Sequence, residues 1–195
     1  MNNIKDFFKD IKKTAYLALI SYIIICFFNI KNIVSYGNYY FDFSSMFGIT
    51  RLISLITDFA FLIYFIIIIN RFKTKKGNVK AAQKFLLVSI VALTILNFII
   101  EIYYICNYGF DFRDLRSLVI NLIYCWYFVG LFKNIKCKIN NKWFVGIIIV
   151  NFLYVQFLLY KFSFISFLLG ILSLLYLPYF YRYYDIKNNK YVKES

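Results

Sequence analysis

The sequence has no histidine, and its four cysteines follow no CxxC or other ligand spacing. Histidine is the usual general base near neutral pH and the commonest metal ligand, so its absence excludes His triads and His metal sites. HExxH, GxSxG and Walker motifs are also absent from the sequence. We therefore expect no enzyme activity, no metal and no cofactor, and we interpret the cysteines as small apolar residues of a packed bundle.

Proline and glycine are scarce as well. One Pro and seven Gly among 195 residues leave little room for disordered linkers. Hydrophobic residues make up 62% of the chain and aromatic residues 23%, whereas a soluble domain is usually about 45–50% apolar. This is more apolar sequence than a water-soluble core can bury. The composition predicts one membrane domain with short loops and no soluble domain.

Acidic residues are few, at nine against 23 Lys and Arg, and the net charge is +14. Such a charge is also typical of nucleic-acid binding. However, the cations form short tracts between apolar runs, where the positive-inside rule places them, and no tract is long enough for a binding domain. We expect no nucleic-acid partner. We expect instead attraction to anionic lipid headgroups at the cytoplasmic face, worth about 1 kcal/mol per cation.

The apolar runs predict an all-α polytopic transmembrane helix bundle. Residues 50–70 and 85–106, joined by a basic turn over 71–84, give the clearest signal. Each run is long enough to cross a hydrocarbon core of roughly 30 Å at about 1.5 Å per residue. The aromatic stretch 31–49 is predicted to be an outer loop. The six predicted spans are residues 15–30, 50–70, 85–106, 115–132, 143–160 and 164–181.

The charge distribution predicts that both termini are cytoplasmic. The N-terminal lead 1–14, the two basic turns and the tail 182–195 together carry 18 Lys and Arg, against five on the other side. The lead is amphipathic, and no small-residue cleavage site follows the first apolar run, so that run is expected to be retained as a span. Only a short turn separates the last two runs. A single re-entrant hairpin over 143–181 is therefore the alternative to two spans.

Two segments resemble each other and suggest an internal repeat. Residues 36–37 and 108–109 are both Tyr-Gly, and a Phe-Asp-Phe follows each of them at 41–43 and 110–112. We interpret the chain as three degenerate copies of a two-helix hairpin, with chance matching of low-complexity sequence as the alternative. The aromatic stretches 39–43 and 179–184 are predicted to lie in the interfacial belt, the alternative being a partner-binding surface on the outer loops.

Two acids fall inside apolar spans and mark a candidate site. Asp58 and Glu101 lie roughly 10 Å and roughly 8 Å from the outer ends of their helices, at about 1.5 Å per residue. A charge in the bilayer costs at least about 2.5–3.5 kcal/mol, so both acids are expected to face a cation, water or the bundle interior. The predicted intramembrane polar cluster consists of Arg51, Asp58, Asn97, Glu101, Arg116 and Asn121.

This cluster has a structural and a functional interpretation. In the structural one, Asp58 and Glu101 contact Arg51 or Arg116, and interhelical bonds of about 0.6 kcal/mol each fix helix register. In the functional one, the cluster is a proton- or cation-linked site open to the outside. Asn151 either joins the lining or bonds to a neighbour. The expected protein is a structural, accessory or interaction protein that binds a membrane-protein partner or a second copy; the alternative is a subunit of a small-solute or ion transporter.

The stretch Leu-Pro-Tyr-Phe at 177–180, followed by Arg182 and by Ile-Lys-Asn at 186–188, resembles the closing motif of a known family. This is the domain of unknown function 2569 family of bacterial integral membrane proteins, whose last helix ends in a W-I-P-Y-F-like motif followed by a basic tail. Asp185 departs from it, because the family has a cation there, and the family has four spans. The resemblance implies a protein of the bacterial cytoplasmic membrane without an assigned activity. The abundance of Ile, Phe, Tyr, Asn and Lys is also typical of an AT-rich bacterial genome.

Overall fold

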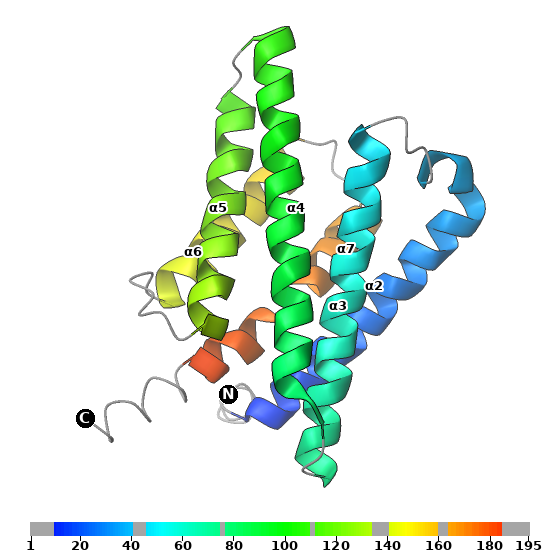
Figure 1. Ribbon diagram of the computed structural model, residues 1–195, viewed down its shortest axis with the longest axis vertical. Coiled ribbons are helices and arrows are strands. Elements are labelled where there is room, and N and C mark those ends of the chain that lie inside the picture. The colour runs from blue at the N-terminus through cyan, green and yellow to red at the C-terminus, as the bar shows by residue number, and fades with distance from the viewer. Residues whose placement is uncertain are drawn as a thin grey trace.

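The computed structural model describes residues 10–40, 46–74, 77–109, 112–133, 141–159 and 164–184, and these form an all-α bundle without a strand, as predicted. A π-helical turn (Val155–Leu159) continues α6, and residues 177–184 form a last helical segment after a turn at Leu175 and Tyr176. The helices are α2 (Ile11–Tyr40), α3 (Met46–Thr74), α4 (Val79–Tyr108), α5 (Phe112–Lys133), α6 (Asn141–Tyr154) and α7 (Phe164–Leu174) (Figure 1).

Four of these helices are long and apolar enough to cross a membrane. The corresponding stretches are Ile11–Ser35, Gly48–Thr74, Val79–Asn107 and Leu115–Phe132, which match the first four predicted spans. The apolar part of α6 and its continuation is shorter, at Asn141–Phe157, and α7 has 11 residues. That residues 143–160 and 164–181 each cross the membrane stays a prediction, as does the re-entrant alternative.

The helices extend further than the apolar runs do. Residues 31–40 and 46–49 are helical, although 31–49 was predicted to be a loop, and helix also covers 71–74 and 79–84 of the predicted basic turn. A helix satisfies its own backbone groups, so it continues past the hydrocarbon into the interface. Asn78 caps α4 by accepting a hydrogen bond from the Ala81 amide at 3.1 Å. Gly77, with a φ of +133°, permits the turn before this cap.

The helix ends sort into two groups. The start of α2, the end of α3, the start of α4 and the end of α5 lie toward the lower end of Figure 1, called here the basal end. The end of α4 and the start of α5 lie at the opposite, distal end (Figure 1). The helix ends next to the predicted cytoplasmic basic tracts thus lie together at the basal end. The side of a membrane that this end faces stays a prediction.

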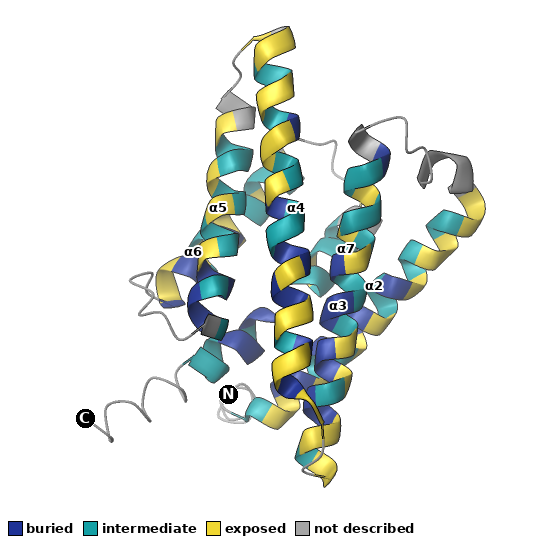
Figure 2. Cartoon of the chain, in the orientation of Figure 1, coloured by how far each residue is buried: buried dark blue, intermediate teal, exposed yellow. Residues whose placement is uncertain are grey.

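The core lies in the basal half of the bundle. Helix α2 packs on α3, α3 on α4, α4 on α5 and α5 on α6, and α7 packs on α2. Buried residues gather toward the basal end, while α2 slants away from α3 toward the distal end (Figure 2). Fully buried Ala15 and Ala18 lie near the start of α2, and fully buried Ala60 lies in the middle of α3. Such small side chains let helix backbones approach closely in a membrane.

Residues 176–184, called here the closing segment, insert into this core. Tyr176, Tyr179 and Phe180 are buried. The Phe180 ring stacks on Tyr64 of α3 with centroids 5.7 Å apart and meets Phe128 of α5 edge-on at 5.0 Å. The prediction of an interfacial belt over 179–184 is therefore wrong for Tyr179 and Phe180, which are 1% and 0% exposed. Their rings fill the space between helices that are themselves apolar on every side.

Candidate functional site

Asp58 lies in the middle of α3 and is partly buried. Its Oδ2 accepts a hydrogen bond of 2.9 Å from Asn29 Nδ2 of α2. Tyr22, Cys26 and Tyr124 lie within electrostatic range of the carboxyl. The structure thus gives Asp58 an amide partner in place of the predicted arginine, because α2 is the helix that packs against α3 on this face.

Arg116 belongs to a different helix interface. Its Nη1 donates a hydrogen bond to Asn151 Oδ1 of α6, and its guanidinium lies 5.0 Å from the ring centroid of Tyr154. Its Nε is buried and has no hydrogen-bond partner among the described residues. The partner of Asn151 is thus a member of the predicted cluster, so both alternatives for this residue stay predictions.

The other four residues of the predicted cluster lie on α3, α4 and α5. Arg51 is exposed and Glu101 is half-buried, and each of them has an interaction in the structure. Asn97 and Asn121 are half-buried. The described hydrogen bonds of Asp58 and Arg116 lead outward, to α2 and α6, rather than to each other. The predicted cluster is thus divided between at least two interfaces.

Asn29 is the residue that sequence reasoning missed. It lies at the edge of the predicted span 15–30, where a polar side chain is unremarkable. Since α2 continues to Tyr40, Asn29 is in fact well inside the helix and at the level of Asp58. Its polarity within a longer helix is the signal that points to an interhelical partner.

Hydrogen bonds tie the closing segment to the basal ends of the helices. The Tyr64 and Tyr179 hydroxyls lie 3.2 Å apart. Tyr127 of α5 donates to Asn141 Oδ1 at 2.8 Å, and Asn141 Nδ2 donates to the backbone oxygen of Tyr181 at 2.9 Å. Buried hydroxyls and amides need such partners, because an unsatisfied polar group is costly away from water. The network therefore fixes the register of the closing segment.

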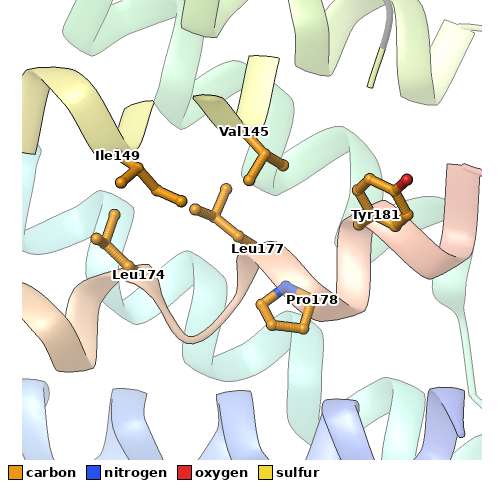
Figure 3. A pocket seen from close by; sticks show the side chains of 6 residues that line it. All are labelled: Val145, Ile149, Leu174, Leu177, Pro178 and Tyr181. Carbon is orange, nitrogen blue, oxygen red and sulfur yellow. The ribbon is translucent and has the colours of Figure 1, made fainter. Parts of the chain in front are cut away.

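Two hollows flank α6. The smaller has a volume of about 240 Å³ and lies between α6 and the chain around the closing segment (Figure 3). Its walls are Val145, Ile149, Leu174, Leu177, Pro178 and Tyr181. The larger, of about 450 Å³, lies between α5 and α6, and Arg116, Asn151 and Tyr154 line it. The lining of both hollows is almost wholly apolar, and the larger one has the cation Arg116 among its lining residues.

No protein-family model, no curated protein and no solved structure matches the chain. The resemblance to the domain of unknown function 2569 family therefore stays a prediction. Within the part of the chain that the structure describes, no three His, Cys, Asp or Glu side chains gather in a group that could hold a metal ion. The expectation that the protein has neither a metal nor a cofactor also stays a prediction. The function must be argued from the helices and their contacts.

Proposed function

We propose that this chain is a structural, accessory or interaction protein of a bacterial cytoplasmic membrane, with both termini in the cytoplasm and no catalytic chemistry of its own. Its partner would be another membrane protein or a second copy of the chain. The four long apolar helices support the membrane location, and the 18-to-five charge bias supports the orientation. The observation that best supports the structural role is that aromatic side chains fill the interior of the basal half of the bundle, called here the aromatic filling.

This filling lies between Asp58 and the basal end of α3. Phe61, Tyr64 and Phe65 follow Asp58 along the helix, and all three are buried. Tyr176 of the closing segment stacks on Phe61 with centroids 5.3 Å apart, and Phe180 packs against Phe65 at 5.9 Å. A solute that moved from Asp58 along α3 would have to displace these rings. A packed bundle that holds its helices in register accounts for the filling more simply than a transport path does.

A transporter subunit is the second candidate, and Asp58 itself favours it. An ionisable residue inside a membrane is a functional hypothesis by default. The partner of Asp58 is an amide, which can hydrogen-bond to either the ionised or the protonated carboxyl. A proton- or cation-linked site would therefore need water to reach Asp58 from the distal end.

Water access to position 58 separates the two candidates. A Cys placed there in a Cys-free version is treated with a membrane-impermeant thiol reagent in intact cells. Positions 42 and 111 serve as outer controls, and Ile56→Cys, at a lipid-facing site 39% exposed, reports any partition of the reagent into lipid. We expect labelling at 42 and 111 and none at 56 or 58.

Labelling at 58 but not at 56 would contradict the closed bundle and favour the transporter, and solute uptake would be measured next. Labelling at position 75, with none at 42 and 111, would show that the orientation is the reverse of the one proposed. In either case the location in a membrane would stand, so each part of the proposal fails separately.

A further inference from the structure

The larger hollow beside α6 has the shape of a groove along the outside of the bundle. Ile120 of α5 lines one side, and Gly146, Ile147 and Val150 of α6 line the other. Val150 is 67% exposed and Trp143, at the basal end of the groove, is 71% exposed. In a chain that spans a membrane, these side chains face lipid rather than water. The groove is therefore in contact with acyl chains along its length.

The length of the groove fits one lipid leaflet. From Trp143 to Tyr154 the α6 axis rises about 16 Å at 1.5 Å per residue, and half of a hydrocarbon core of roughly 30 Å is about 15 Å. Gly146 leaves the middle of the groove open, since no described atom lies within 4 Å of a Cβ placed on it. An extended acyl chain can therefore lie against the backbone of α6.

The charge of the groove is positive and is concentrated at its distal end. Arg116 is the cation among the lining residues, and none of those residues is acidic. Asn151 and the Tyr154 ring hold the guanidinium in place. Asn151 uses one of its five N–H groups and the Nε–H is buried, which leaves three donors. Arginine binds phosphate oxygens through its remaining donors, and a guanidinium already fixed in place loses little entropy when it does so.

We propose that the α5–α6 groove binds one anionic phospholipid, with an acyl chain along Gly146 and Val150 and the phosphate at Arg116. The apolar channel and the single cation at one end match the two parts of such a lipid. By the predicted orientation, the lipid belongs to the outer leaflet. The other conceivable occupants, a free anion or a second copy of the chain, match only one of these two parts.

The test uses native mass spectrometry of the purified full-length chain titrated with dioleoyl phosphatidylglycerol. We expect one phosphatidylglycerol molecule to stay bound and dioleoyl phosphatidylcholine to bind more weakly. Arg116→Gln should weaken phosphatidylglycerol binding about tenfold, as expected for a lost charge-assisted hydrogen bond. Arg116→Lys should bind more tightly than Arg116→Gln. Lys80→Gln, at an exposed cation on α4, should bind as the unchanged chain does.

Gly146→Leu tests the groove itself without removing any contact. Leucine fills the open space and is a better helix former than glycine, so the variant is expected to fold. It should also weaken phosphatidylglycerol binding about tenfold, as expected when binding energy of about 1.4 kcal/mol is lost. Gly146→Ala, which leaves most of the space open, should not weaken it.

Four results would overturn the proposal. The first is the absence of bound phosphatidylglycerol, and the second is that Arg116→Gln and Gly146→Leu bind it as tightly as the unchanged chain does. The third is displacement of the lipid by inorganic phosphate at a similar concentration. The fourth is that the chain forms a dimer which Gly146→Leu loses, without any change in lipid binding. The third would identify a free-anion site, and the fourth a contact between two copies.

Discussion

Asn29 and Asp58 join the middle of α2 to the middle of α3 through one hydrogen bond of 2.9 Å. Asn29→Leu removes the donor, so the Asp58 carboxyl loses this hydrogen bond inside the bundle. We expect the free energy of unfolding to fall by about 0.6–1.7 kcal/mol, the range measured for hydrogen bonds between membrane helices. Reversible unfolding in mixed detergent micelles measures this change.

Asn97→Leu is the matched control for this variant, because it removes the same amide from a half-buried position on α4. We expect the control to leave the free energy of unfolding nearly unchanged. Equal losses in the two variants would show that amide burial, and not the bond to Asp58, causes the effect.

Gly77 carries a second prediction at the residue scale. Its φ of +133° is one that residues with a Cβ rarely adopt, and a Cβ there would lie 3.3 Å from the Ile67 carbonyl oxygen. Gly77→Ala should therefore lower the free energy of unfolding by about 1–3 kcal/mol. Gly146→Ala, within α6 and in open space, should raise it by up to about 1 kcal/mol. The same micelle unfolding measurement compares the two, and a loss in both would argue against strain at Gly77.

Sequence reasoning found Asp58 but not its partner, and the reason is physical. An acid within an apolar run is conspicuous, because its burial is expensive. By contrast, the sequence does not show which face of the helix around Asp58 points into the bundle. Helices α2 and α3 are apolar on all sides, so their sequences contain no periodic pattern that separates lipid-facing from inward positions. The direction of Asp58, and therefore its pairing with Asn29, could not be predicted.

The closing segment is the element on which the basal core depends. Phe180 is fully buried, and its ring contacts rings from both α3 and α5. Phe180→Ala should lower the free energy of unfolding by about 3–5 kcal/mol, as for other buried Phe residues. Phe27→Ala, at a position 65% exposed on α2, should change it by less than about 1 kcal/mol.

Unfolding in mixed micelles again measures both variants. A small loss for Phe180→Ala would mean that the segment rests on the helices without stabilising them. The structural role proposed for the aromatic filling would then have to be abandoned.

At the element scale, hydropathy located the helices but not their ends or their neighbours. It measures the apolar run, whereas helix continues through polar interfacial residues such as those at 71–74 and 79–84. The closing segment was misjudged for a related reason. Alternating Tyr and Phe near a basic tail is typical of an interfacial belt, and the sequence does not distinguish this from rings that turn back into the core.

For the whole molecule, the number of crossings is the open prediction. Six crossings place the start of α7 outside, whereas a re-entrant hairpin places it on the same side as the termini. Phe164→Cys, at an exposed first residue of α7, tests this in a Cys-free chain. We expect an impermeant thiol reagent to label both this variant and Asn107→Cys, near the end of α4, in intact cells. Labelling only after the cells are opened would establish the re-entrant hairpin.

The grouping of helix ends at two opposite ends of the bundle was the part of the fold most readily predicted from the sequence. Charged tracts and apolar runs alternate along the chain, and each crossing of the bundle reverses direction, so the basic tracts must alternate with the outer loops. The structure places the corresponding helix ends together at the basal end (Figure 1). The unequal packing of the basal and distal halves was not predictable, because it depends on ring contacts between residues more than one hundred positions apart, such as Tyr64 and Tyr179.

The position of the closing segment has a consequence for the biogenesis of the protein. The ribosome synthesises α2 to α5 first, and each can enter the bilayer as an independent helix. The closing-segment rings that pack against the rings of α3 and α5 emerge last, so the inserted helices wait with an incomplete interior. A chain that stops before Tyr176 would keep all four long helices but lack the buried rings of Tyr176, Tyr179 and Phe180. Such truncated chains should therefore be degraded by membrane proteases faster than the full chain is.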